Sequence, residues 1–469
     1  MPGMNTTESA GDPRLVAAFH AALAREGLAV LAVLVALLVA ARLVRVSAYR
    51  AAIGAGGAPA GPVAGRSQGA EPPARRLVRL AFGMLWLLDG LLQAQASMPG
   101  RFVPVVVRPT AAASPAFVRR VTSFATSTWL HHPVTAAAAV VWIQAGLGLW
   151  LLVAARGRWS RLGGAAGALW ALVVWVFGES FGGIFATGAS GLFGAPGAAL
   201  FYLLAGVLLA LSEGAFVTER LGRLLLRLLG ADLLAVAVLQ AWPGRGFWHS
   251  GTRGTLPAMV HAMSATLQPG PVSSMLDSFA SFAAAHEPAV NAVAVAGFGL
   301  LGAACVTARA RVVAWAGVPG TAFLLATWVL VQDFGVLGGV GTDPNSMLPL
   351  LVLGAAGYLG LVRPAAHRAP PRSDGAPGGL LEGLRWRAAR DPSALLRNIA
   401  AGAALAVVLL GAVPMAVVAL EPPPSVPGAQ PAATTRDASP ASSRHQLRAP
   451  SQAGAHVPWR SPSPRHGQR

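Results

Sequence analysis

Ten apolar stretches, each close to the length of a membrane-spanning helix, constrain this chain more than any other feature. A helix needs about 20 mostly apolar residues to cross a hydrocarbon core roughly 30 Å thick. Charged residues make up only 12% of the 469-residue chain and apolar residues 54%, whereas a soluble domain has about 25% charged residues. We therefore predict an all-α, polytopic membrane helix bundle surrounded by the lipid bilayer. The predicted spans are residues 27–46, 77–97, 134–155, 162–179, 195–213, 224–242, 289–307, 313–332, 346–362 and 399–420.

Arginine content alternates between successive connections, and this predicts the orientation of the bundle. Cytoplasmic loops of membrane proteins carry an excess of basic residues. With the N-terminus outside, five inner connections hold 22 of the 36 basic residues, all of which are arginine. The sequence thus predicts a multi-pass protein of a bacterial plasma membrane with both termini outside. Because the charge is spread over membrane loops, we do not expect nucleic-acid binding.

A direct internal repeat is the most informative pattern. "GMLWLLDGLLQA" (83–94) matches "GADLLAVAVLQA" (230–241), and "WVFGESFGG" (175–183) matches "WVLVQDFGV" (328–336). Each copy would hold four spans, so both copies insert the same way round, with a pseudo-twofold axis along the membrane normal. The alternative is chance similarity among helices rich in Ala, Leu and Gly.

The repeat and the spans together predict the order of segments along the chain. The bundle is expected to start with a leading span and to end with a trailing span, on either side of the two four-helix repeats. The segments are an outer N-terminal segment (1–26), the leading span (27–46), a cytoplasmic Gly/Pro-rich linker (47–75), the repeats (76–213 and 220–362), a cytoplasmic loop (363–398), the trailing span (399–420) and a disordered basic tail (421–469).

Two resemblances accompany this layout. A four-span unit that begins with "RLVRLAFGMLWLLDGLLQAQ" (76–95) resembles the DoxX-like membrane proteins, so the chain resembles two such units in tandem. That resemblance implies a redox-associated subunit that handles a quinone, although no signature here carries over the thiosulfate–quinone electron transfer of some members. "WVFGESFGGIF" (175–185) and "GGVGTDPNSMLPL" (338–350) are similar to uncharacterised actinobacterial integral membrane proteins.

Polar side chains within the spans or at their ends are the candidates for a cavity that binds a small molecule. An ionisable group inside a membrane is costly and usually faces a cavity or a partner. Asp89 and Gln93 are four residues apart and share a helical face, and glycine-rich turns follow Glu179 and Asp333. The alternatives are structural contacts between helices and plain tight turns. The candidates are Asp89, Gln93, Gln144, Glu179, Gln240, Gln332 and Asp333.

Histidines and a glutamate at corresponding outer ends of the two copies form a candidate metal site. The residues are His131, His132, His286 and Glu287. Across a pseudo-twofold axis they would be able to meet around a metal, and the alternative is ordinary helix-end histidines at the headgroup level. The histidines avoid the middles of the spans, which argues against a haem in the bundle core. One cysteine, Cys305, excludes a disulfide within the chain, a thiolate zinc site and an iron–sulfur cluster.

Three classes of function remain open from the sequence. The first is a protein that binds or moves a small molecule, with a lipid-phase molecule as one candidate, in a cavity between the two repeats. The others are a DoxX-like redox-associated subunit and a structural or assembly protein. An enzyme is less expected, because no catalytic residues with nucleophile–base spacing are present and a P-loop or pyridoxal-phosphate site would need lysine. The sequence assigns no cofactor and no protein partner.

Overall fold

The protein is described here by a computed structural model that covers residues 12–54, 71–249, 255–337, 339–362 and 392–421. These residues form helices and connecting turns, without a β-strand, which confirms the all-α class. Seven helices are long and apolar enough to cross a membrane. The chain is therefore a multi-pass membrane protein. The seven are α1 (Pro13–Gly54), α6 (Pro133–Val153), α7 continued by η2 (Gly157–Gly178), α9 (Glu219–Ala241), α11 (Gly270–Thr307), α12 (Ala310–Leu330) and α15 (Pro392–Leu420).

Three further apolar helices coincide with the other predicted spans. Helix α2 (Pro73–Gln93) is followed, after an 87° bend, by the helical segment Met98–Ala112, and the pair would count as an eighth span. Helices α8 (Ala198–Ala210) and α13 (Met347–Val362) are shorter apolar helices. Most of the predicted boundaries agree with the helices to within a few residues. The main difference is α1, which begins well before residue 27 and continues to Gly54, so parts of the predicted N-terminal segment and linker are helical.

Proline sets the position of two equivalent breaks. Helix α5 (Ala116–His131) ends where Pro133 begins α6, and the intervening His132 has non-helical φ −130°. In α11 the same break is a kink at His286, φ −132°, two residues before Pro288. Proline lacks an N–H and disfavours helical geometry in the residues just before it. In both places the chain therefore turns from an outer helical segment into a span.

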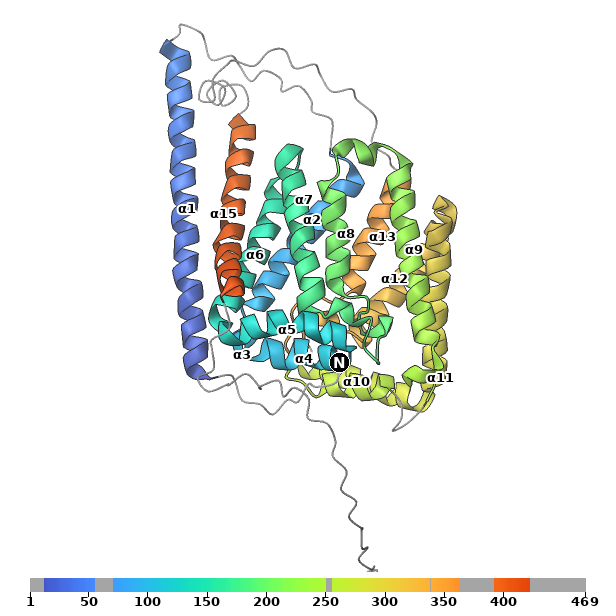
Figure 1. Ribbon diagram of the computed structural model, residues 1–469. Coiled ribbons are helices and arrows are strands. Elements are labelled where there is room, and N and C mark those ends of the chain that lie inside the picture. The colour runs from blue at the N-terminus through green and yellow to red at the C-terminus, as the bar shows by residue number, and fades with distance from the viewer. Residues whose placement is uncertain (1–11, 55–70, 250–254, 338, 363–391, 422–469) are drawn as a thin grey trace, which may run out of the picture. The chain divides into compact units, whose positions relative to one another are not determined.

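Glycines bring the helices together in two groups of four. The first group is α2, α6, α7 and α8, and the second is α9, α11, α12 and α13 (Figure 1). A Cβ atom on Gly148 of α6 would stand 2.7 Å from the carbonyl oxygen of Gly83 on α2, and one on Gly302 of α11 would stand 2.9 Å from that of Gly230 on α9. Small residues of this kind let membrane helices approach to backbone contact. The two groups therefore share one feature: α6 packs closely on α2 at a pair of glycines, and α11 packs on α9 in the same way.

Helices α1 and α15 both pack on the first group. Gly411 of α15 lies against the backbone of Ala139 and Ile143 in α6. Trp142 of α6 donates a 2.8 Å hydrogen bond from Nε1 to Glu26 in α1. The predicted leading and trailing helices are thus neighbours, joined through α6.

Short helices cover one end of the spans. They are α3 (Met98–Arg101), η1 (Phe102–Val107), α4 (Arg108–Ala112), α5 and α10 (Thr255–Ser264), and they run across the bundle near the ends of α2 and α7 (Figure 1). We call this the outer end. The predicted cytoplasmic loop falls largely outside the described residues, as does the tail except Glu421.

A buried ion-pair network closes the opposite end of the first group. Arg75 is fully buried and donates to Ser160 Oγ at 2.8 Å and to the carbonyl oxygen of Leu209 at 3.2 Å. Glu71 forms ion pairs with Arg75 at 3.2 Å and with Arg79 at 2.8 Å. The two guanidinium groups thereby bind the carbonyl ends of neighbouring helices. The sequence did not predict this network, because these arginines served there only to orient the bundle.

Candidate binding cavity

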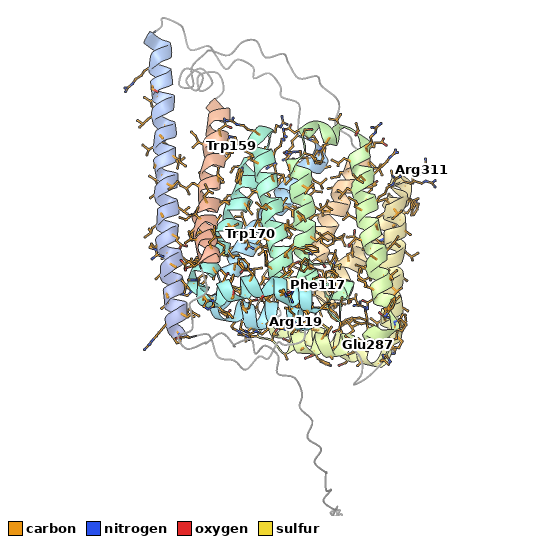
Figure 2. All side chains as sticks on the ribbon, in the orientation of Figure 1. Phe117, Arg119, Trp159, Trp170, Glu287 and Arg311 are labelled. Carbon is orange, nitrogen blue, oxygen red and sulfur yellow. The ribbon has the colours of Figure 1, made fainter. Side chains whose placement is uncertain are left out.

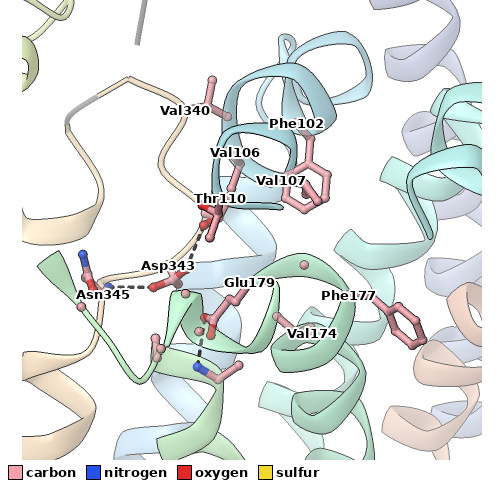
Figure 3. A pocket seen from close by; sticks show the side chains of 18 of the residues that line it. Phe102, Val106, Val107, Thr110, Val174, Phe177, Glu179, Val340, Asp343 and Asn345 are labelled. Atoms are coloured by element: carbon pink, nitrogen blue, oxygen red, sulfur yellow. Dashed lines mark hydrogen bonds between the residues drawn. The ribbon is translucent and has the colours of Figure 1, made fainter. Parts of the chain in front are cut away.

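A cavity of about 610 Å³ lies at the outer end of the first helix group. Helices α2, α6, α7, η2 and α8 form its walls, and η1, α5 and α10 close over it. Two loops complete the lining (Figure 3): residues 179–197, which we call the first outer turn, and residues 332–346, the second outer turn. Most of the lining is apolar. The exposed lining residues Phe124, Thr187, Gly188 and Ala258 all belong to the outer end, so the cavity opens on that side.

Three predicted residues on α2 and α6 face the cavity together. Asp89 is 2% exposed, and Gln93 and Gln144 are each 4% exposed. All three line the cavity. The atoms Asp89 Oδ1, Gln93 Oε1 and Gln144 Oε1 are buried without a hydrogen-bond partner. Buried polar atoms are nearly always satisfied in proteins, so these three acceptors are open to a ligand.

Glu179 enters the cavity from the first outer turn. Its Oε1 accepts a 3.0 Å hydrogen bond from the backbone N–H of Ala199, in the first turn of α8, and its Oε2 has no partner. A Cβ at Gly197 would stand 2.1 Å from Oε2, so glycine is required there. Burial and the neighbouring carboxylate of Asp343 raise the pKa of Glu179 well above its ordinary value.

Asp343 reaches the same cavity from the second outer turn (Figure 3). It accepts hydrogen bonds from Thr342 Oγ1 and from the backbone N–H of Asn345, both at 2.8 Å. Burial raises the pKa of Asp343, and these two hydrogen bonds oppose the rise. Sequence reasoning treated Asp343 as part of a possible plain turn and missed its place in the cavity.

Tyr202 of α8 is the second residue that sequence reasoning missed. Its ring packs edge-on against Trp86 at 4.7 Å and against Phe82 at 5.1 Å. Its buried hydroxyl lines the cavity beside Asp89, with which it interacts electrostatically, but makes no hydrogen bond of ordinary geometry. The available signal was compositional, since the chain has only three tyrosines and this one lies in an apolar span.

The charges of the lining have one sign. Three carboxylates, on Asp89, Glu179 and Asp343, line the cavity, and no described lining residue is Arg or His. Each carboxylate acts electrostatically on at least one of the others. Aromatic rings make up much of the remaining wall, namely Trp86, Phe102, Phe124, Trp129, Trp170, Phe177, Phe193 and Tyr202.

The other three predicted residues either make hydrogen bonds within the fold or lie outside the cavity. Gln332 lines the cavity edge but is used structurally, since it accepts from Met347 N at 3.4 Å and donates to the carbonyl oxygen of Leu192 at 3.3 Å. Gln240 is not a lining residue; it is hydrogen-bonded to Ser190 at 2.5 Å and to Asn291 at 2.7 Å. Asp333 is fully buried outside the cavity, and both its carboxylate oxygens lack partners. The structure therefore places five of the seven predicted residues around this cavity and leaves Gln240 and Asp333 outside it.

The corresponding place in the second helix group is filled. Asp89 follows Gly83 by six residues and Gln144 precedes Gly148 by four; the same steps from Gly230 and Gly302 lead to Val236 and Phe298. Both of these apolar residues are buried. They pack against Gly191 of the first outer turn, where an added Cβ would stand 2.0 Å from Val236.

The predicted metal ligands are not gathered into a metal site. Among the described residues no group of three or more His, Cys, Asp or Glu is arranged to hold a metal ion. The rings of His131 and His286 are hydrogen-bonded to backbone carbonyl oxygens one turn earlier, and His132 lies 3.1 Å from Glu421. Glu287, which lies where α10 meets α11 (Figure 2), accepts from Leu256 N at 2.9 Å. Because each side chain already has a local partner, they remain apart.

Comparison with known proteins adds no assignment. No protein-family model, curated protein or solved structure matches this chain. The function must therefore be inferred from the cavity itself.

Proposed function

We propose that this membrane protein binds a small molecule in the outer cavity of the first helix group and moves it, or holds it, across the outer part of the bilayer. The observation that carries the proposal is the set of unpartnered buried acceptors on Asp89, Gln93, Gln144 and Glu179 around a cavity of about 610 Å³. Ligand pockets typically have volumes of about 300–1,000 Å³, with mostly apolar walls and a few convergent polar groups. This cavity has all three properties.

We further propose the ten-span architecture and the direct repeat. Helices α2, α8 and α13 would join the seven longer spans. In support, Trp175 packs on Phe181 at 5.4 Å and Trp328 on Phe334 at 5.1 Å, both with interplanar angles of 79°. Moreover, Glu179 Oε1 accepts from the start of α8 just as Gln332 Oε1 accepts from the start of α13. Chance similarity would not be expected to reproduce side-chain contacts of this kind.

The orientation that we propose puts both ends of the chain on the outer face of a bacterial plasma membrane. Leu15, near the start of α1, packs against Gly100 of α3, and Glu421, after the end of α15, pairs with His132. Both contacts are at the end of the bundle where the cavity opens. Among the described residues, the arginine-bearing connections 156–161 and 309–311 lie at the other end, where Figure 2 labels Trp159 and Arg311, as expected of the cytoplasmic side. The ligand would then reach the cavity from outside.

The test is native mass spectrometry with lipid-phase extraction of the detergent-purified full chain, recording every retained molecule. The informative variant combines Asp89→Val with Gln144→Phe, because it introduces the apolar pair that fills the second group. Asp232→Asn is the matched control, since Asp232 lies on α9 and does not line the cavity. We expect a molecule present in wild type and control and lost in the filled variant. Identical spectra from all three proteins would contradict the proposal.

A quinone-handling role is the second candidate, and the aromatic walls of the cavity favour it. Trp86, Trp129 and Trp170 line the cavity and offer faces on which a quinone ring would stack. The DoxX-like resemblance implies the same role. The two candidates differ in the extracted molecule: a quinone in the wild-type spectrum would select this one.

A further inference from the structure

We infer that the ligand of the outer cavity is an amphipathic organic cation, whose ammonium or guanidinium group lies among Asp89, Glu179 and Asp343 while its apolar body lies against the aromatic wall. This inference rests on the proposed binding function and names the chemical class of the ligand.

The first argument is charge balance. Burying a carboxylate without a counter-charge is costly. At the inner end of the same helix group the chain meets this cost with its own residues, because Arg75 and Arg79 surround Glu71. Around the cavity three carboxylates converge, and the described lining residues supply no cation. Without a ligand, the raised pKa values of Glu179 and Asp343 favour protonated carboxyls, and a cationic ligand would take the place of these protons.

The second argument is the kind of hydrogen-bonding atom left open. Four of the six unpartnered buried atoms on the described cavity lining, those of Asp89, Gln93, Gln144 and Glu179, are carbonyl or carboxylate oxygens, which only accept. The other two are the Tyr202 hydroxyl, which accepts or donates, and Trp170 Nε1, which donates. An ammonium group offers three donors and a guanidinium five, with no acceptor. An anionic or purely accepting ligand would leave the four oxygens unsatisfied, so the open atoms favour a ligand rich in donors.

The third argument separates an organic cation from a metal ion. Calcium, for example, takes six to eight oxygen ligands within about 2.6 Å, whereas no described group of three acidic or histidine residues is close enough to hold a metal. The carboxylates instead border a cavity of about 610 Å³ with aromatic walls. A charge spread over an organic group fits this space, and rings such as Trp86 and Trp170 would stabilise it through cation–π contacts.

The experiment compares two probes of nearly equal shape and opposite charge. Binding of radiolabelled tetraphenylphosphonium and of tetraphenylborate to the purified full chain in nanodiscs would be measured at pH 7.5. Benzylammonium is added as a slimmer cation that carries three N–H donors. The isosteric variant Asp89→Asn with Glu179→Gln removes two charges, and Asp232→Asn is again the control. We expect benzylammonium to bind, the borate not to bind, and the affinity for benzylammonium to fall about tenfold or more in the double variant, since a hydrogen bond to a charged group contributes about 1.5–3 kcal/mol.

The outcomes separate this inference from the proposed function. Equal binding of the borate, unchanged cation affinity in the double variant, or no binding of either cation would overturn the inference. In the first two cases, loss of probe binding in the filled variant Asp89→Val with Gln144→Phe would leave the proposed function standing. Probe binding that survives filling would overturn both. Melting curves of each variant in nanodiscs verify that a loss of binding does not reflect unfolding.

Discussion

The outer turn of each helix group crosses over to contact the other group, and the two contacts have opposite consequences. The first outer turn reaches the second group, where Gly191 packs against Val236 and Phe298. The second outer turn reaches the first group, where Gln95 donates a 2.9 Å hydrogen bond to the carbonyl oxygen of Gly341. One crossing fills a site with apolar atoms, and the other leaves a cavity lined by carboxylates. Similar helix contacts thus support a closed core in one group and an open cavity in the other.

The inner ends of the two groups also differ, because an ion pair is buried in the first group and exposed in the second. Glu71 and Arg75 form an i,i+4 ion pair that is almost completely buried and is extended by Arg79. Glu219 and Arg223 form the corresponding i,i+4 pair, but both side chains are about half exposed. The first group therefore combines a hollow outer end with a tightly bonded inner end. We interpret the buried network as compensation for packing lost around the cavity.

The largest predicted effect concerns these two ion pairs. Glu71→Gln would leave Arg75 and Arg79 without a counter-charge, and removing one partner of a buried pair costs about 3–5 kcal/mol of unfolding free energy. Glu219→Gln, at the equivalent place, should cost about 0–1 kcal/mol because exposed pairs contribute little. Unfolding of each variant in mixed micelles measures both values. Equal losses in the two variants would show that the networks do not differ as described.

The second prediction tests the filled site. Gly191→Val would place a side chain where an added Cβ already stands 2.0 Å from Val236. We expect a loss of about 2–3 kcal/mol, because overpacking a dense core typically costs 1–3 kcal/mol. Gly188→Ala in the same turn is the control, since a Cβ there meets nothing within 4 Å. Thermal unfolding that is unchanged in Gly191→Val would mean that this turn does not fill the second group.

The spans were predictable from sequence because they depend on a local property. Apolar length and proline position are read directly along the chain, and α6, α9 and α13 lie close to their predicted limits. Two candidate residues on one helical face, Asp89 and Gln93, were likewise predictable, since four residues complete about one helical turn. The structure places both in the cavity.

The crossing of the outer turns was not predictable, because it depends on contacts far apart in sequence. Asp343 precedes α13 of the second helix group but lines the cavity of the first group, and Gln240 of α9 is hydrogen-bonded to Ser190, which lies in the first outer turn. The sequence-based prediction assumed that aligned positions in the two helix groups have the same role. Val236 and Phe298 stand where the first group has Asp89 and Gln144, and this change from polar to apolar residues already indicated different roles.

The third prediction concerns pH and the second outer turn. Burial raises the pKa of Asp333 to about 6, whereas in the unfolded chain it has its ordinary value near 3.8. Between these two pH values the folded state therefore holds a proton that the unfolded chain has released. The free energy of unfolding decreases as pH rises through 6, where the folded state loses this proton. Asp333→Asn removes this dependence, and asparagine tolerates the left-handed φ of 48° at this position.

The measurement for Asp333 is unfolding free energy against pH. We expect the variant to equal the wild type near pH 4 and to exceed it by roughly 2–3 kcal/mol at pH 8, since the shift from 3.8 to about 6 is about two pKa units and one unit corresponds to about 1.4 kcal/mol. Asp343→Asn is not a suitable control because Asp343 lines the cavity. The control is Glu219→Gln, which removes a carboxylate that is about half exposed. A difference that is largest at low pH would contradict the assigned direction.

The smallest predicted effect exchanges the helix cap of the first group for that of the second. Glu179→Gln copies Gln332, whose amide oxygen accepts from the start of α13 in the way that Glu179 accepts from Ala199. Because the accepting oxygen is kept, we expect the unfolding free energy at pH 4, below the raised pKa of Glu179, to change by less than about 0.5 kcal/mol, whereas Glu179→Leu should lose about 1 kcal/mol with the capping hydrogen bond. If Glu179→Gln were as destabilising as Glu179→Leu, the negative charge rather than the cap would hold α8, and the two outer turns would not be built on the same principle.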